Sequence, residues 1–128
     1  MKKIILAIII CVSVINATAQ KCTEVKQGKF RITGDETNPN ESILTRTAEH
    51  QFEEVKSKGL KFQFDIKWTS DCTYELSKPR VIKGDYPYFS DGQVVYVKIT
   101  KVTSKYYSAE ITSNFAEFKM TKDIQIIK

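Results

Sequence analysis

A strict alternation of apolar and polar side chains over residues 60–69 constrains the fold of this chain more than any other feature. The apolar members all fall on even positions: Leu60, Phe62, Phe64, Ile66 and Trp68. Successive side chains of a β-strand point to opposite faces of the sheet, so this pattern predicts a half-buried strand.

The same alternation recurs in shorter runs, at 30–32, 72–76, 95–99, 107–111 and 116–126. Lys122 is the one break in the last run, and it indicates a bulge or a barrel rim. Glycine, proline and asparagine residues separate the runs. We therefore predict an all-β meander of seven or eight short antiparallel strands closed into a small barrel, with a β-sandwich as the alternative.

Residues 47–58 fit two local structures. Ala48, Phe52 and Val55 have helical spacing, which would suit a short helix that ends before the next glycine. The largely β-branched residues 43–47 lead straight into this stretch and favour a hairpin instead. We expect strands here.

Parity predicts how the strand at 60–68 turns into the strand at 72–76. Both carry their apolar residues on even numbers, and opposed residues of an antiparallel pair share a face. The shortest loop that satisfies both strands is 69–71, which pairs Ile66 with Tyr74. Such a loop usually ends in the left-handed region, so Asp71 is predicted to have a positive φ.

The predicted inward side chains are bulky. An eight-stranded barrel is just wide enough to be filled by side chains or to hold one small ligand. We therefore expect a filled interior rather than an open cavity. The residues expected inside are Phe30, Leu60, Phe62, Phe64, Ile66, Trp68, Tyr74, Tyr107, Phe118 and Met120.

The first 19 residues have the organisation of a secretory signal peptide. Two lysines precede the uncharged residues 4–15, and Ala17 and Ala19 form the small-x-small cleavage pattern. Cleavage leaves one β-barrel domain, residues 20–128, in the periplasm or outside the cell. The apolar run is shorter than the roughly 20 residues of a spanning helix, so no stable membrane anchor is expected.

Two of the three cysteines, Cys22 and Cys72, remain after cleavage. Disulfides form and persist in oxidising compartments, and small exported domains often depend on them. We expect one bridge between these two residues.

The charge pattern excludes several functions. Loss of Lys2 and Lys3 reduces 20 basic residues to 18 against 15 acidic ones, a net charge of +3. The signs alternate without a basic block, so nucleic acid is not an expected partner. No phosphate loop, dinucleotide fingerprint, nucleophile elbow or metalloprotease motif is found. We expect a monomer with no catalytic residue, no metal and no cofactor.

Two acidic groups are candidates for chemistry. Glu53 and Glu54 are adjacent, so in a strand they point to opposite faces and cannot act as an acid–base pair. Oxygen-bearing side chains at 35–40 could bind calcium, although turn formation is the favoured interpretation.

Residues 83–92 form the longest connection with turn-forming residues. The residues of interest in it are Asp85, Tyr86, Tyr88, Phe89 and Asp91. Loops on rigid scaffolds carry binding residues, and exposed aromatic side chains are favoured anchors in interfaces. The other interpretation is that the three aromatic residues fold inward and plug the barrel end.

A set of spaced residues resembles a family of small exported bacterial proteins without an assigned function. Its members in this chain are Cys22, Gly28, Phe30, Arg46, Gln51, Glu53, Trp68, Asp71, Cys72 and Tyr74. The resemblance implies a shared fold and disulfide and a structural role for these residues. Some members carry the label DNA topoisomerase IV, which this short exported chain without an ATP-binding motif does not support.

Gly28-x-Phe30 is also similar to the opening motif of lipocalins. This resemblance implies carriage of a small ligand, which is the less favoured function. The sequence by itself does not determine a function. We expect a non-enzymatic surface-binding module for an envelope protein or glycan, and as the alternative a carrier of a small apolar ligand in the barrel interior.

Overall fold

The computed structural model describes residues 22–127, so the predicted signal peptide and the cleavage site before Gln20 lie outside the described residues. The elements in chain order are η1 (Cys22–Val25), β1 (Gly28–Ile32), β2 (Ser42–Arg46), β3 (His50–Val55), η2 (Lys56–Lys58), β4 (Leu60–Ser70), β5 (Thr73–Lys83), β6 (Val94–Val102), β7 (Tyr106–Ser113) and β8 (Met120–Ile127). The two η elements are short 3-10 helices. The prediction of an all-β fold is confirmed.

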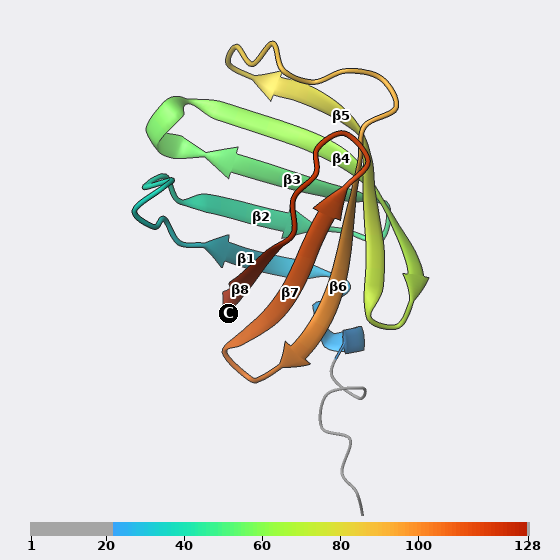
Figure 1. Ribbon diagram of the computed structural model, residues 1–128. Helices are drawn as coiled ribbons and strands as arrows, with labels where there is room; N and C mark the ends of the chain where they lie inside the picture. Colours follow the sequence, from blue (N-terminus) through green and yellow to red (C-terminus); the bar gives the residue numbers. More distant parts are fainter. Residues whose placement is uncertain (1–21, 128) are drawn as a thin grey trace, which may run out of the picture.

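The eight strands form one closed antiparallel barrel, in which each strand pairs with the next and β8 pairs with β1 (Figure 1). In the closing pair, Phe30 of β1 lies opposite Ile126 of β8. Closure removes the unpaired sheet edges that an open meander would expose. The predicted barrel is confirmed with eight strands, and the sandwich alternative is wrong.

The turn between β4 and β5 differs from the prediction. It contains two residues, Asp71 and Cys72, between the paired Ser70 and Thr73. The three-residue loop at 69–71 is therefore wrong. So is the positive φ of Asp71, because among the non-glycine residues from 22 to 127 only Lys78 has one (φ 49°).

A β-bulge reconciles this two-residue turn with the apolar faces of the two strands. The register shifts between Trp68 and Ser70, and beyond the shift Trp68 lies opposite Tyr74. The extra residue restores the parity that a two-residue turn would break. Ile66 and Tyr74 consequently share the inner face, as predicted, although they are not directly paired.

Residues 50–55 form strand β3, so the favoured interpretation of the 47–58 segment is confirmed. The chain then makes the single 3-10 turn η2 and leaves it at Gly59, whose φ of 63° lies in the left-handed region that favours glycine.

Most of the predicted inward side chains are buried. Phe30, Leu60, Phe62, Ile66, Tyr74 and Tyr107 are at most 9% exposed. Phe64 and Trp68 are half-buried and pack against the core. These bulky residues fill much of the interior, as expected.

Two residues of that set are not core residues. Phe118 lies between β7 and β8, where its backbone N–H donates to the Ala116 carbonyl in a tight turn. Met120 begins β8 at its rim and is 41% exposed. The alternation continued through these positions, but the turn takes residues 114–119 out of the sheet.

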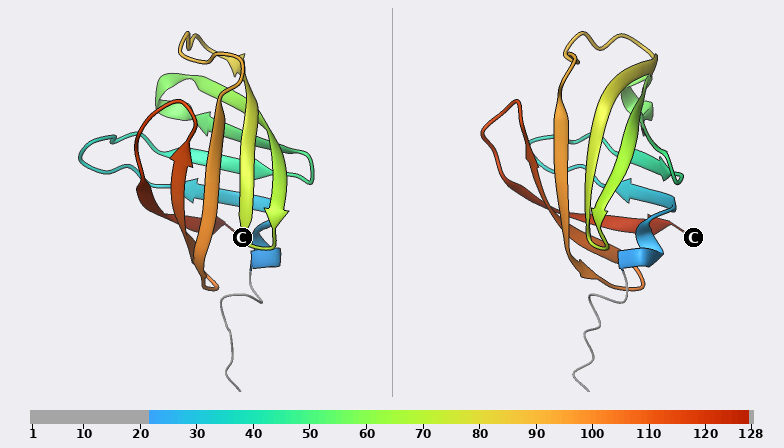
Figure 2. Two further views of the ribbon diagram at one scale, coloured as in Figure 1. Left: turned by 45° about the vertical axis from the view of Figure 1, so that its right-hand side comes forward. Right: turned by 90° about the vertical axis from the view of Figure 1, so that its right-hand side faces the viewer.

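The two ends of the barrel are built differently. The connections at 47–49, 71–72 and 103–105 are short turns at the same end as η1, which lies beside the β4–β5 turn (Figure 2). The longer connections 33–41, 56–59, 84–93 and 114–119 gather at the other end (Figure 1). We call these the closed end and the open end.

Candidate functional site

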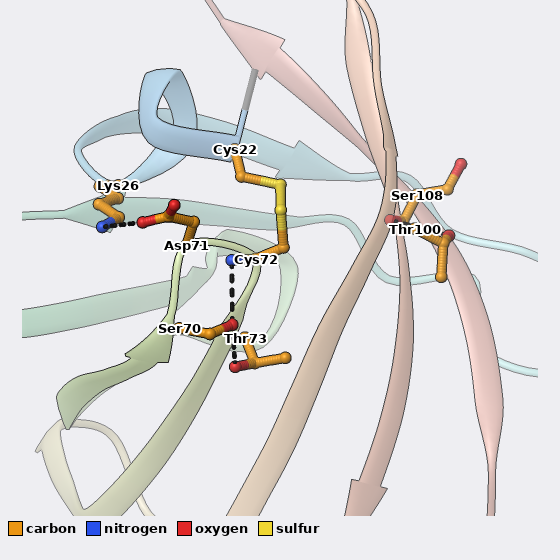
Figure 3. The surroundings of a disulfide bond; sticks show 8 residues. All are labelled: Cys22, Lys26, Ser70, Asp71, Cys72, Thr73, Thr100 and Ser108. Carbon is orange, nitrogen blue, oxygen red and sulfur yellow. Dashed lines mark hydrogen bonds and ion pairs between the residues drawn. A yellow bond between two sulfur atoms is a disulfide. The ribbon is translucent and has the colours of Figure 1, made fainter. Parts of the chain in front are cut away.

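The closed end is sealed by η1 and the disulfide. Cys22 and Val25 of η1 are fully buried, and Cys22 is bonded to Cys72 across a Cα–Cα distance of 5.2 Å (Figure 3). Lys26 reaches the exposed Asp71 carboxylate at 3.8 Å on the same side. The predicted bridge is confirmed, and it ties the N-terminal segment across the barrel end.

Arg46 lies beneath this cap and is 2% exposed. Its guanidinium donates to the Val25 carbonyl at 2.7 Å and to Oε1 of Gln51 at 3.0 and 2.7 Å. It also donates to the hydroxyls of Tyr74 at 3.1 Å and Tyr107 at 2.9 Å. Every one of these acceptors is uncharged, so hydrogen bonds rather than a carboxylate stabilise the buried cation.

Aromatic rings enclose the same guanidinium. Its Cζ lies 4.6 Å from the centre of the Phe30 ring and 4.7 Å from that of Tyr74. Burial raises the pKa of Tyr74 well above its ordinary value, so the phenol stays neutral. Cation–π contacts of this kind are strongest where water is excluded.

The structure therefore brings together most of the residues on which the family resemblance rests. Phe30, Arg46, Gln51 and Tyr74 form one buried cluster, and the Trp68 ring lies 4.7 Å from that of Tyr74. Gly28, with a φ of 130°, begins β1 at this end, and Asp71 is exposed in the turn. The burial and hydrogen bonding of this cluster support a structural role for these residues.

The open end holds a pocket of about 210 Å³. Its lining combines apolar residues of β3 and β4 with polar and charged groups from β2, β3, η2 and the 33–41 and 84–93 connections. The lining residues are Asn38, Asn40, Ser42, Glu53, Val55, Lys58, Leu60, Phe62 and Tyr86.

Glu53 is the family-motif residue that the structure separates from the buried cluster. It lies on β3 between Leu44 of β2 and Phe62 of β4, both buried, so its side chain faces the barrel interior. It is half-buried and lines the pocket. Burial raises the pKa of its carboxyl group.

The aromatic residues of the 84–93 connection divide between two roles. The rings of Tyr86 and Phe89 pack on Phe62 at centroid distances of 4.9 and 5.0 Å, as expected for a plug of the barrel end. Tyr88 contacts the ring of Tyr86 at a centroid distance of 5.0 Å but is 73% exposed. Asp85 and Asp91 are exposed as well. Of the three aromatic residues, Tyr88 has the geometry of a surface contact.

Exposed large hydrophobic residues gather at the open end. Among residues 22–127 they are Val81, Ile82, Tyr88, Tyr96, Phe115 and Met120. All but Tyr96 lie in the open-end connections or at the strand ends next to them. We call these five residues the apolar rim.

An ion pair between Lys122 of β8 and Asp35 of the 33–41 connection lies at the open end, and the sequence analysis did not predict it. Lys122 lies opposite the buried Ala109, and its Nζ donates to Oδ2 of Asp35 at 2.8 Å. Oδ1 of Asp35 accepts the backbone N–H groups of Thr37 and Asn38 at 2.9 and 2.8 Å. The Lys122 hydrogen bond, helped by those from Thr37 and Asn38, holds the pKa of Asp35 well below its usual range.

This ion pair explains the break in alternation at Lys122. The β7–β8 ladder has no register shift, so the bulge is wrong and the rim position is correct. The contacts of Asp35 also show that residues 35–38 form a turn, the interpretation favoured over a calcium loop. Within residues 22–127, no group of three or more histidine, cysteine or acidic side chains could hold a metal ion.

The fold and site define this molecule as a closed eight-stranded antiparallel barrel with one sealed end and one pocketed end. Comparison with models of protein families, with curated proteins and with solved structures finds no match. No helix in the described part of the chain is long and apolar enough to cross a membrane.

Glu53→Gln is expected to raise the melting temperature by a few degrees at neutral pH. The pKa of Glu53 is higher in the folded than in the unfolded protein, so its favourable contribution to stability is present below the unfolded pKa of about 4.3 and is lost as pH rises through the folded value. The gain should therefore shrink toward zero in acid. Thermal unfolding from pH 3 to pH 8 measures it.

Glu54→Gln is the matched control, because Glu54 is the next residue of β3 and points to the outer face, at the register position opposite Lys61 of β4. This variant should show no gain at neutral pH. Equal stabilisation by both substitutions would contradict the burial of Glu53.

Proposed function

We propose that this chain is an exported, non-enzymatic binding protein that docks a protein partner on the open end of its barrel. The observation that carries the proposal is the apolar rim, which lies at the same end of the barrel as the pocket beside Glu53, here called the mouth pocket, whereas η1 and the disulfide cover the closed end. Exposed apolar patches on small soluble proteins commonly mark interaction sites.

The composition of the rim favours a protein over a glycan. It combines Ile82, Tyr88, Phe115 and Met120, and aromatic residues and methionine are enriched at protein interfaces. The outer face of β5–β7 also carries a depression around Tyr96, but its lining mixes threonines with lysines and glutamates, as a solvated sheet face does.

Carriage of an apolar ligand is the less favoured function. Drug-sized ligands occupy pockets of about 300–1,000 Å³, and the mouth pocket holds about 210 Å³. Its inward wall carries the Glu53 carboxylate, which an apolar ligand would leave desolvated without a partner.

Export is part of the proposal and is supported by two features. The first 19 residues have the organisation of a cleavable signal peptide. The bridge between Cys22 and Cys72 is of a kind that persists in an oxidising compartment.

Site-specific photo-crosslinking tests the docking surface. A photoreactive phenylalanine analogue at position 88 is expected to give a discrete protein adduct in the producing cells, because Tyr88 stands on the rim. The same analogue at position 96 is the control, since Tyr96 is an exposed tyrosine on the outer face of β6. Mass spectrometry identifies the adducts.

Adducts at position 88 and none at 96 support docking at the open end. Adducts at position 96 alone, adducts with glycan, or no adduct at position 88 would overturn the proposal.

A further inference from the structure

The residues that line the mouth pocket indicate which chemical group of the partner could bind there. This inference rests on the function proposed above. The pocket is too small for a folded element and has room for a single side chain. Val55, Leu60 and Phe62 contribute apolar surface to its lining, beside Tyr86 and the polar side chains of Asn38, Asn40 and Ser42. Such apolar surface suits an alkyl stem.

Glu53 lacks the partner that the other inward charges have. Arg46 donates a hydrogen bond to Gln51 at the closed end, and Lys122 donates one to Asp35 at the open end. No residue between 22 and 127 makes a hydrogen bond or ion pair with the Glu53 carboxylate. A half-buried carboxylate without a partner in the protein is partly desolvated and still free to accept hydrogen bonds from a ligand, and such groups are found at functional sites.

An ionised carboxylate only accepts hydrogen bonds, so the inserted group has to donate them. A cationic donor gains most, because charge-assisted hydrogen bonds are about twice as strong as neutral ones. The carboxylate disfavours an anion, because two like charges would be held close together.

The other charged and titratable groups near the pocket do not change the preference of Glu53 for a cationic donor. Lys58 lines the pocket from the η2 side, but it is exposed and makes no ion pair with Glu53. Tyr86 faces the pocket from the 84–93 connection. Lys122 on β8 is neutralised by Asp35 of the 33–41 connection.

We propose that the mouth pocket binds an alkylammonium group, the side chain of a lysine on the docked protein partner, with Glu53 as its counter-ion. The alkyl stem lies along the apolar part of the lining and the ammonium group donates to the carboxylate. The apolar rim, at the same end of the barrel, supplies further contacts with the partner.

Titration of the processed, oxidised protein with n-butylammonium chloride, followed by two-dimensional NMR, tests this inference. We expect saturable shifts at the amides of Ser42, Val55 and Phe62, and weaker binding as pH falls and Glu53 is protonated. Glu53→Gln should weaken binding at least tenfold, and Glu54→Gln should leave it unchanged. The Glu53→Gln variant is expected to fold, because the substitution removes a buried charge.

n-Butanol and sodium butyrate are the matched probes, because they keep the alkyl chain and change the charge. Equal binding of n-butanol, or butylammonium binding that survives Glu53→Gln, would overturn the charge selection. Absence of any butylammonium shift in the pocket would overturn the site. Either result together with adducts at position 88 leaves open-end docking intact, whereas loss of those adducts removes the docking itself.

Discussion

Arg46→Met is expected to lower the free energy of unfolding by about 3–5 kcal/mol, because it leaves several buried neutral acceptors without a donor, at a cost of about 1–3 kcal/mol for each one that stays unsatisfied. The substitution removes the donor to the Val25 carbonyl, Gln51 and the hydroxyls of Tyr74 and Tyr107. For a domain of this size the melting temperature should fall by about 10–20 °C. Urea unfolding and calorimetry measure the two quantities.

Arg46→Lys tests whether charge or geometry matters. Lysine keeps the charge but lacks the planar fork that reaches several acceptors at once, so we expect a loss of about 2–3 kcal/mol. Arg80→Ala is the control, because Arg80 is exposed and pairs with Asp65 at 3.4 Å on the outer surface. It should cost less than about 1 kcal/mol. A loss at Arg46 no larger than that at Arg80 would contradict the buried cluster.

Removal of the Cys22–Cys72 bridge is expected to cost about 4 kcal/mol, the chain-entropy value for a loop closed over a separation of 50 residues. Urea unfolding of the oxidised protein and of the Cys22→Ala/Cys72→Ala variant measures the difference. The reduced wild type is the control, and its stability should match that of the double variant.

The bridge and Arg46 should not act independently. The disulfide holds η1 in place, and η1 supplies the Val25 carbonyl that Arg46 binds. The combined loss in Arg46→Met without the bridge should therefore be smaller than the sum of the two. The Glu53 pocket, at the other end, should still bind butylammonium. Additive losses would mean that the cap and the cluster are separate units.

The strands were predictable because alternation is a local property. The run at 60–68 shows which side chains share a face without any knowledge of the neighbouring strand. The disulfide was predictable for a similar reason, since the two cysteines that follow the predicted signal peptide allow one bridge.

The register of the β4–β5 hairpin was not predictable in the same way. The apolar residues of β4 and β5 all have even numbers, so the connection between Trp68 and Tyr74 has to keep them on one face. A three-residue loop does so, and so does a two-residue turn with a bulge beside it. The structure has the bulge. The exclusion of Phe118 from the core had a comparable origin, because a tight turn at Ala116 overrides alternation.

The inward orientation of the charged residues at the two ends of the barrel was only partly predictable from the sequence. Arg46 has the parity of the buried Leu44, and Glu53 that of the buried Val55, so each carried a signal for the inner face. Charged residues are ordinarily exposed, so the sequence alone favours the outer face for both residues. The closed barrel shows that residues of this parity face the interior.

The sequence by itself determined that this protein is an all-β chain, which side chains of its strands share a face, and that one bridge joins Cys22 to Cys72. The tertiary structure decided that Arg46 meets Tyr107, 61 residues away, and that Glu53 meets no partner within the described chain. The physical reason is the range of the interactions. Side-chain alternation follows from the geometry of one strand, whereas contacts across a barrel depend on every bulge and turn that sets the register around it.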